Sequence, residues 1–331
     1  MNKRVLLQGL LGVGGVALWG PVAWAQAPAL DKFTVAGWSK PITEISNLLA
    51  EPEQGFFKAQ GIDLGYVPGA GGGDAVRNLL SGQADVAFTD PGSFFAALDK
   101  GEKLRAIYDI YPQNVFNVVA LKSSGITQPK DLKGKRIGVY SLSSGTRTNL
   151  QVLLQQAGLT EADVTIVVTG LLNFAPLMQG QVDATAATDT GLAVGRARGL
   201  GDVNLIEVKD HLNHSSDLFV VKEDTYQQKK ALLRRFLSAY RASAQWMIDK
   251  PEAAVQVAAK HAIDGQNAAI ALEVVRLRNR SAVSALTQKA GLGTLDVPSL
   301  QAAADAYRRL GLINQPIRVR DVVAADLLPV R

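Results

Sequence analysis

Short apolar runs alternate with amphipathic stretches over the first two thirds of the chain, a pattern typical of strands followed by helices. Such strand–loop–helix units are predicted at residues 33–36 with 42–50, 64–67 with 75–80, 136–140 with 148–157, and 164–168 with 174–178. A further apolar run follows each pair of units. Each half is therefore predicted to be β-α-β-α-β, which implies parallel strands with right-handed crossovers.

A weak internal repeat supports two similar halves. Residues 80–92 carry Gly-Gln-x-Asp, a short apolar run and Thr-Asp-x-Gly, and residues 178–191 repeat this order with one more residue in between. Two lobes explain the repeat better than two halves of one large sheet, because a single sheet would leave residues 101–134 without a place. That stretch holds apolar runs at 104–108 and 115–121, and we interpret it as the passage between the lobes.

The last third is predicted to be helical after one more extended run at 216–221. Helical spacing of apolar residues predicts a helix over 225–250, and Pro251, Asp264 and Pro298 are expected to open further helices. These helices should pack on lobe one, so that the chain crosses between the lobes twice and forms a two-strand hinge. The expected boundaries are a leader at 1–25, lobe one at 26–118, lobe two at 119–220, and the return to lobe one at 221–331.

The leader resembles a secretory signal peptide. Lys3 and Arg4 precede an apolar run at 5–19, and Ala-Trp-Ala at 23–25 fits a cleavage site before Gln26. An uncleaved membrane anchor is the alternative, but the run is short and rich in glycine for a membrane span. We therefore expect export by the general secretory route to the periplasm.

Composition narrows the class of protein. The chain has 331 residues and no cysteine, so neither disulfides nor a lipid-bearing cysteine are available, and a lipoprotein is not expected. Without residues 1–25, which hold two basic and no acidic side chains, 33 basic and 30 acidic residues leave a net charge of +3. The charges are interspersed, which does not favour a nucleic-acid partner. About 300 residues suit two ordinary domains.

Ligands of open parallel sheets bind outside the carboxyl ends of the strands, where helix N-termini offer free N–H groups. The loops predicted there lie at 37–40, 68–74, 89–93, 141–146, 170–174 and 188–191. If the lobes face each other, both sets of loops line one cleft. The candidate ligand-binding residues are Trp38, Ser39, Gly72, Gly73, Asp90, Pro91, Gly92, Ser93, Ser143, Ser144, Gly145, Thr146, Asn173 and Asp189.

Several of these residues allow a second interpretation. The glycine-rich loop at 68–74 lacks the dinucleotide and phosphate-loop patterns, so a loop that lets a ligand or the other lobe approach closely is favoured. The hydroxyls at 141–146 could cap a helix, bind a ligand, or both. Asp90 and Asp189 are expected to cap helices; pointing into the cleft, either would favour an amine or ring N–H over an anion. Trp38 is equally suited to the core and the cleft wall.

No metal, cofactor or catalytic residue is predicted. His211 and His214 are spaced H-x-x-H without an acidic or cysteine partner at metal-ligand spacing, so a solvated loop is favoured over a metal site. No nucleophile elbow is visible, and His261 is expected to be structural.

The order of four segments, at 53–62, 79–88, 131–139 and 180–184, resembles the nitrate/sulfonate/taurine class of ABC-importer binding proteins, which includes binders of thiamine pyrimidine precursors. The resemblance implies a type-two periplasmic binding protein fold, two doubly wound α/β lobes with C-terminal helices on lobe one, and a membrane permease as partner. It also maps the family's anion-holding helix start onto residues 143–146, and its lobe-one contacts onto 91–93 and 38–39. The lobe-one loops contain no arginine, which disfavours a strongly charged anion as the ligand.

Two ligand classes follow. The first hypothesis is a monomeric periplasmic binding protein for a small organic anion such as a sulfonate or carboxylate. The alternative is a thiamine pyrimidine precursor or another planar heterocycle. An enzyme of the related pyrimidine-synthase type is disfavoured, because the resemblance to that type implies a cysteine-rich motif that is absent.

Overall fold

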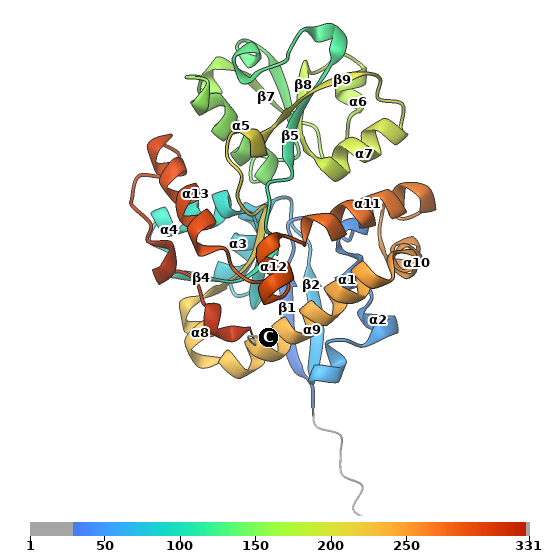
Figure 1. Cartoon of the computed structure of the whole chain (residues 1–331), viewed down its shortest axis with the longest axis vertical. Helices are drawn as coiled ribbons and strands as arrows, with labels where there is room; N and C mark the ends of the chain where they lie inside the picture. The colour runs from blue at the N-terminus through green and yellow to red at the C-terminus, as the bar shows by residue number, and fades with distance from the viewer. Residues whose placement is uncertain (1–28, 329–331) are drawn as a thin grey trace, which may run out of the picture.

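The computed structural model describes residues 29–328, which form two lobes stacked end to end (Figure 1). Each lobe is built on a five-stranded sheet. In lobe one the strands lie in the order β2 (Ile62–Val67), β1 (Asp31–Ala36), β3 (Val86–Thr89), β10 (Asp217–Lys222) and β4 (Leu104–Tyr111). In lobe two the order is β7 (Thr165–Val168), β6 (Arg136–Val139), β8 (Ala184–Thr188), β5 (Phe116–Leu121) and β9 (Val203–Glu207). The predicted leader at 1–25 lies outside the described residues.

The two sheets have the same plan. β1 pairs in parallel with β2 and β3, and β6 pairs in parallel with β7 and β8. β10 and β5 are inserted antiparallel beside β3 and β8. The prediction of two β-α-β-α-β lobes is confirmed. The crossing strands run antiparallel because each enters its sheet from the hinge, at the end where the other strands stop.

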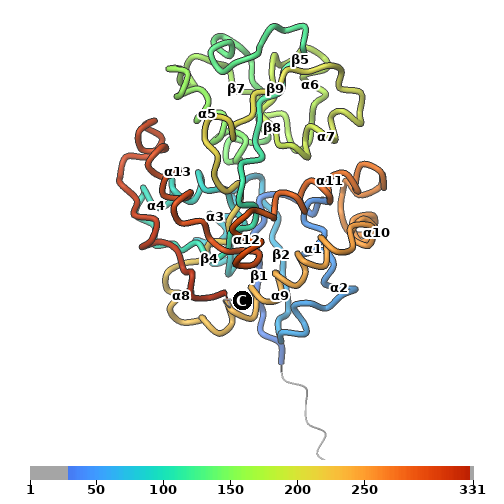
Figure 2. The backbone as a smooth tube through the Cα atoms, in the orientation of Figure 1, coloured from blue at the N-terminus to red at the C-terminus, as the bar shows by residue number. Residues whose placement is uncertain are grey.

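The two crossings between the lobes lie a few residues before their expected places. β5 pairs along its whole length in lobe two, and β10 along its whole length in lobe one, so the expected boundaries after residues 118 and 220 cut through both strands. The crossing segments run side by side (Figure 2), with Val115 N–H donating to Ser216 Oγ at 3.0 Å and Ser216 N–H donating to Tyr111 O at 2.9 Å. This pairing makes a two-stranded hinge.

The helices divide unequally between the lobes. Lobe two holds α5 (Gly145–Gln156), α6 (Ala175–Met178) and α7 (Asp189–Ala197). Lobe one holds α1 (Ser46–Leu49), α2 (Glu51–Gln54), α3 (Gly72–Leu80), α4 (Pro91–Asp99), α8 (Glu223–Gln228), α9 (Lys230–Asp249), α10 (Pro251–His261), α11 (Ala268–Ser281), α12 (Ala285–Ala290) and α13 (Val297–Arg309). The C-terminal helices pack around lobe one, as predicted (Figure 1). None of the helices within residues 29–328 is long and apolar enough to cross a membrane.

Two helix boundaries differ from their predictions. The helix expected over 225–250 is interrupted at Lys229, whose φ of −120° and ψ of 27° leave the helical region. Asp264 does not open a helix, since Asn267 caps α11 by accepting hydrogen bonds from Ala269 N–H and Ile270 N–H. Asp264 instead accepts two hydrogen bonds of 2.8 Å from the backbone N–H and hydroxyl of Thr43.

The lobe-one sheet is fixed by an aromatic core against α9. Phe236 of α9 lies 4.5 Å from Phe33 and 5.2 Å from Phe219, measured between ring centroids, and all three rings are fully buried. Phe88 joins this cluster from β3 at 5.4 Å from Phe219. Burial of each ring contributes on the order of 2–3 kcal/mol. The ends of these strands therefore present the cleft loops from a rigid base.

Candidate ligand-binding site

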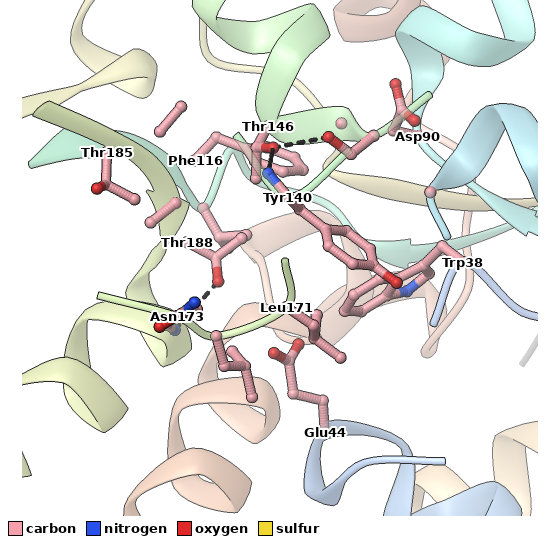
Figure 3. Close-up of a pocket in the computed structure, with 18 of the residues that line it drawn as sticks. Trp38, Glu44, Asp90, Phe116, Tyr140, Thr146, Leu171, Asn173, Thr185 and Thr188 are labelled. Carbon is pink, nitrogen blue, oxygen red and sulfur yellow. Dashed lines mark hydrogen bonds between the residues drawn. The ribbon is translucent and has the colours of Figure 1, made fainter. Parts of the chain in front are cut away.

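A pocket lies between the lobes at the carboxyl ends of the parallel strands (Figure 3). Lobe one contributes Trp38, Glu44, Gly71, Gly72, Asp90, Asp217 and Arg278. The hinge and lobe two contribute Val115, Phe116, Tyr140, Ser144, Gly145, Thr146, Thr169, Gly170, Leu171, Leu172, Asn173, Phe174, Thr185, Ala186, Ala187, Thr188 and Gly191. Seven of the predicted site residues are thus brought together: Trp38, Gly72, Asp90, Ser144, Gly145, Thr146 and Asn173.

The start of α5 faces the pocket from lobe two. Ser144 occupies the N-cap position, but its hydroxyl makes no capping bond; it donates to Ser141 O at 2.7 Å and lies 2.7 Å from Thr146 Oγ1. The backbone N–H groups of Gly145 and Thr146 have no acceptor within residues 29–328. Because such orphan donors and the helix dipole attract electronegative atoms, this terminus is suited to a ligand oxygen.

Asp90 caps α4 and lines the pocket at the same time. Its carboxylate accepts from Ser93 N–H at 3.0 Å, from Ser93 Oγ at 2.7 Å, and from the lobe-two hydroxyl of Thr148 at 3.1 Å. Burial raises the pKa of Asp90, and these hydrogen bonds partly offset that rise. Pro91, Gly92 and Ser93 do not reach the pocket, since they form the first turn behind this cap.

The prediction that Asp189 caps its helix is wrong. Thr188 is the N-cap of α7 and accepts from Gly191 N–H at 3.2 Å. Asp189 is the first helical residue, lies outside the pocket lining, and forms an ion pair with Arg278 of lobe one. The two copies of the repeat therefore differ at this point: Asp90 is the N-cap of α4, whereas Asp189 is the first residue inside α7.

The glycine-rich loop at 68–74 contacts the other lobe. Gly71 has a φ of +131°, and a side chain there would overlap the carbonyl oxygen of Ser143. Gly73 N–H donates to that oxygen at 3.0 Å, and Ser143 Oγ donates to Asp74 Oδ1 at 2.9 Å. Gly73 and Ser143 thus join the lobes instead of lining the pocket. The structure shows a closed cleft.

Trp38 belongs to the cleft wall. Its ring is half-buried, contacts Phe88 edge-on at 6.4 Å between centroids, and leaves Nε1–H without an acceptor within residues 29–328. Ser39 lies behind it, where its hydroxyl donates to Lys40 O at 2.8 Å. Asn173 lines the opposite side, and its amide donates to Thr169 O at 2.7 Å. Asn173 therefore shapes the loop between β7 and α6.

Sequence reasoning missed three charged residues of the pocket: Glu44, Asp217 and Arg278. Asp217 begins β10 and is 7% exposed, and its carboxyl makes no hydrogen bond or ion pair within residues 29–328. Burial raises its pKa far above the usual range, and the nearby carboxyls of Asp90 and Glu44 raise it further. The signal that could have found Asp217 is its place at the start of a predicted crossing strand.

Arg278 projects from the buried face of α11, and no motif marks it in the sequence. It is 1% exposed, its Nε lies 3.2 Å from Glu44 Oε2, and its Nη2 pairs with Asp189. Glu44 Oε1 in turn accepts from the hydroxyl of Thr190 at 2.6 Å. The same helix lies against α7 of lobe two (Figure 1). These contacts close the second side of the cleft.

The histidines have different surroundings from those predicted. His211 is exposed, but His214 is buried, with Nδ1 2.6 Å from Ser215 O and its ring against Tyr307. Burial lowers the pKa of His214 to about 4, so the solvated-loop prediction is wrong for this residue. His261 pairs with Glu53 at 2.8 Å. Within residues 29–328 no group of three or more His, Cys, Asp or Glu side chains is placed to hold a metal ion.

Two mixed sheets, a double crossing and a cleft at the strand ends define a type-two periplasmic binding protein fold. Solved structures share it at low sequence identity. The alkanesulfonate-binding protein SsuA from Xanthomonas axonopodis pv. citri bound to MOPS has a TM-score of 0.69 and 17% identity, with 90% of this chain and 99% of that chain covered. A Candida albicans gene product with the generic periplasmic binding protein fold has a TM-score of 0.68 and 18% identity, covering 91% and 99%.

The sequence of residues 42–254 matches the family described as NMT1/THI5 like, and the chain belongs to that family. The riboflavin-binding protein RibY of Chloroflexus aurantiacus is 22% identical over 91% of this chain and 87% of its own length. The 4-amino-5-hydroxymethyl-2-methylpyrimidine phosphate synthase THI12 of Saccharomyces cerevisiae is 23% identical over 67% of this chain and 68% of its own. These findings confirm the predicted class.

Proposed function

We propose that this protein is the solute-binding component of an ABC importer and that it captures a small planar nitrogen heterocycle between its lobes. The observation that carries the proposal is the carboxyl of Asp217, which is buried on the pocket wall without a protein partner. A buried polar group without a partner is costly, so such a group in a binding cleft is suited to a ligand. We therefore favour a heterocycle over an organic anion as the ligand.

A heterocycle with N–H groups complements the cleft chemically. A protonated carboxyl offers one donor and one acceptor side by side, which match the ring nitrogen and amino group of an aminopyrimidine or the amide edge of a flavin. Trp38 Nε1–H and the buried hydroxyl of Thr185 add polar groups that lack protein partners. Trp38, Phe116 and Tyr140 supply aromatic surface for a planar ring.

The charge of the pocket disfavours a simple anion. Glu44 and Asp90 line it beside the protonated carboxyl of Asp217, whereas Arg278 is the one lysine or arginine among its described lining residues. Arg278 is already paired with Glu44 and Asp189. The open N-terminus of α5 remains suited to an uncharged ligand oxygen, which needs no full negative charge to benefit from the helix dipole.

The relatives support a heterocycle without deciding it. RibY is named for riboflavin and the yeast relatives for a pyrimidine phosphate, and both molecules contain planar nitrogen rings. SsuA, named for alkanesulfonates, shares the fold at 17% identity. The fold therefore accommodates either ligand class, and the side chains that line the cleft determine which class binds.

We propose binding without turnover, although the yeast relatives are named as synthases. The cleft presents carboxyls and aromatic rings, and the chain has no cysteine for the motif expected of that enzyme type. Incubation with the bound molecule should return it unaltered by mass spectrometry. Recovery of a modified product would contradict this part of the proposal.

The proposed partner is a membrane permease, reached from the periplasm after export. Amino-terminal sequencing of the exported protein should then begin near Gln26. For the ligand itself, native mass spectrometry of protein purified from its own cells should show a co-purifying heterocycle. A co-purifying sulfonate or aliphatic carboxylate would restore the anion hypothesis.

A further inference from the structure

The two lobes meet at a buried ion-pair cluster on the pocket wall. Arg278 of lobe one holds Glu44 of its own lobe and Asp189 of lobe two. Its guanidinium carbon also lies 5.1 Å from the centre of the Tyr111 ring. Both Arg278 and Glu44 line the pocket, and their side chains are 1% and 3% exposed.

Glu44 is fixed in this position from two sides. One carboxylate oxygen faces Arg278 at 3.2 Å, and the other accepts from Thr190 Oγ1 at 2.6 Å. Thr190 lies on α7, so this hydrogen bond forms only when the lobes are closed. In the closed cleft, the carboxylate of Glu44 therefore lies against the Nε side of Arg278 and neutralises it, although no hydrogen bond joins the two.

We propose that Glu44 determines the charge of the ligand by occupying Arg278 and so excluding anions from the cleft. This inference rests on the proposed binding of a heterocycle and assigns its selectivity to one residue. An incoming sulfonate would have to displace Glu44 from a buried pair, leaving a carboxylate unpaired, or bind beside it against like-charge repulsion. Both are costly in a closed, poorly screened site. A neutral or cationic ring meets neither obstacle.

The position of Glu44 also suggests how proteins of this fold can differ in the charge of the ligand that they bind. Arg278 lines the pocket, and a guanidinium can bind a sulfonate or carboxylate by a pair of parallel hydrogen bonds. If Asp189 were its only partner, Arg278 would keep some of its guanidinium N–H donors free for a ligand. Removing the charge of Glu44 should therefore convert a cleft that rejects anions into one that admits them.

The test compares two variants that each remove one carboxyl from the same pocket. Glu44→Gln keeps the side-chain length and an acceptor oxygen for Thr190 while releasing part of Arg278. Asp217→Asn is the matched control, because neither an ion pair nor a hydrogen bond joins Asp217 to Arg278 in the described part of the chain. Calorimetry with ethanesulfonate, a plain anion, is expected to show binding about tenfold tighter or more for Glu44→Gln than for the parent. Asp217→Asn should show no such gain.

Circular dichroism on each variant verifies the fold before titration. Glu44→Met, which fills similar space with an apolar side chain, repeats the test if Glu44→Gln does not fold. Equal gains in Glu44→Gln and Asp217→Asn would mean that loss of either carboxyl admits the anion, and no gain in Glu44→Gln would mean that Arg278 stays closed to anions. Either result overturns the role of Glu44. Tighter binding of ethanesulfonate than of riboflavin or 4-amino-5-hydroxymethyl-2-methylpyrimidine by the parent would instead refute the proposed function.

Discussion

Asp217 reaches the cleft because of the way its strand returns to lobe one. Antiparallel pairing places Asp217 opposite Tyr111 at the hinge end of β10, beside the ends of the parallel strands. Its carboxyl is buried there with Asp90 and Glu44 nearby, which raises its pKa and favours the protonated form. A buried carboxyl without a partner lowers the stability of the fold, and its hydrogen-bonding groups remain available to a ligand.

Replacing Asp217 should therefore change stability and binding in opposite directions. Asp217→Leu replaces the unpartnered carboxyl by an apolar side chain of the same branched shape, so its thermal midpoint is expected to rise. Its affinity for the heterocycle should fall by about 0.5–1.5 kcal/mol for each hydrogen bond lost, the usual net worth of a bond between uncharged groups. Asp63→Leu, on the outer strand β2, is the control and should leave the affinity unchanged. Parent-like binding by Asp217→Leu would remove this residue from the site.

Asp109 should make stability depend on pH. Its Oδ2 accepts from Ser215 Oγ at 2.6 Å, its Oδ1 has no partner within residues 29–328, and burial raises its pKa to about 7. The folded protein thus keeps a proton that the unfolded chain loses above about pH 4. Stability from this group is full below that pH and is lost as pH rises toward 7.

Urea unfolding at pH 5 and pH 8 tests this linkage. The parent should lose about 2–3 kcal/mol more than Asp109→Asn over that interval, from the shift of the Asp109 pKa. His214, whose pKa is lowered to about 4, acts in the opposite direction but equally in both proteins. Identical pH dependence in the two proteins would show that Asp109 is ionised in the fold.

At the residue scale, the sequence predicted the uncharged part of the site better than the charged part. Loop residues such as Trp38 and Gly145 follow predicted strands, and strand ends meet in a cleft by the geometry of the fold alone. Glu44 and Arg278 come from helical segments far apart in the sequence, and only their packing brings them together. Ser39 and Ser93 were predicted on position, but their side chains satisfy neighbouring groups behind the pocket.

At the scale of elements, the loop before α3 contacts the other lobe in the closed structure and does not hold the ligand. Gly71→Ala places a methyl group against the Ser143 backbone of the other lobe, so it should oppose closure. Gly82, with a φ of +79° and open space around it, is the matched control for backbone strain. Both alanine variants should lose some stability, of order 1–2 kcal/mol. Only Gly71→Ala should bind the ligand about tenfold or more weakly by calorimetry; equal affinities would contradict the closing role.

The strand–helix alternation and the repeat were enough to predict both lobes, the hinge and the return of the C-terminal helices. The crossing strands were harder to place, since apolar runs such as those of β5 and β10 are the same whether the neighbouring strand is parallel or antiparallel. Their whole-length pairing moves each lobe boundary by a few residues. The break at Lys229 likewise has no counterpart in the apolar periodicity.

At the scale of the whole molecule, the contacts between the lobes surround the pocket. The loop at 68–74 meets residues 140–143 on one side, and α11 meets α7 on the other. A ligand can enter only if these contacts open, so small-angle scattering should give a larger radius for the free protein than for the ligand-bound one. Free protein that already scatters as the closed structure would contradict hinge opening.

The most direct measurement is calorimetric titration of the purified protein at pH 7 with riboflavin, 4-amino-5-hydroxymethyl-2-methylpyrimidine and ethanesulfonate in turn. We predict that a planar nitrogen heterocycle binds one to one, and that a large excess of ethanesulfonate does not displace it. Tighter binding of ethanesulfonate than of either heterocycle would contradict the assignment of the cleft to such rings.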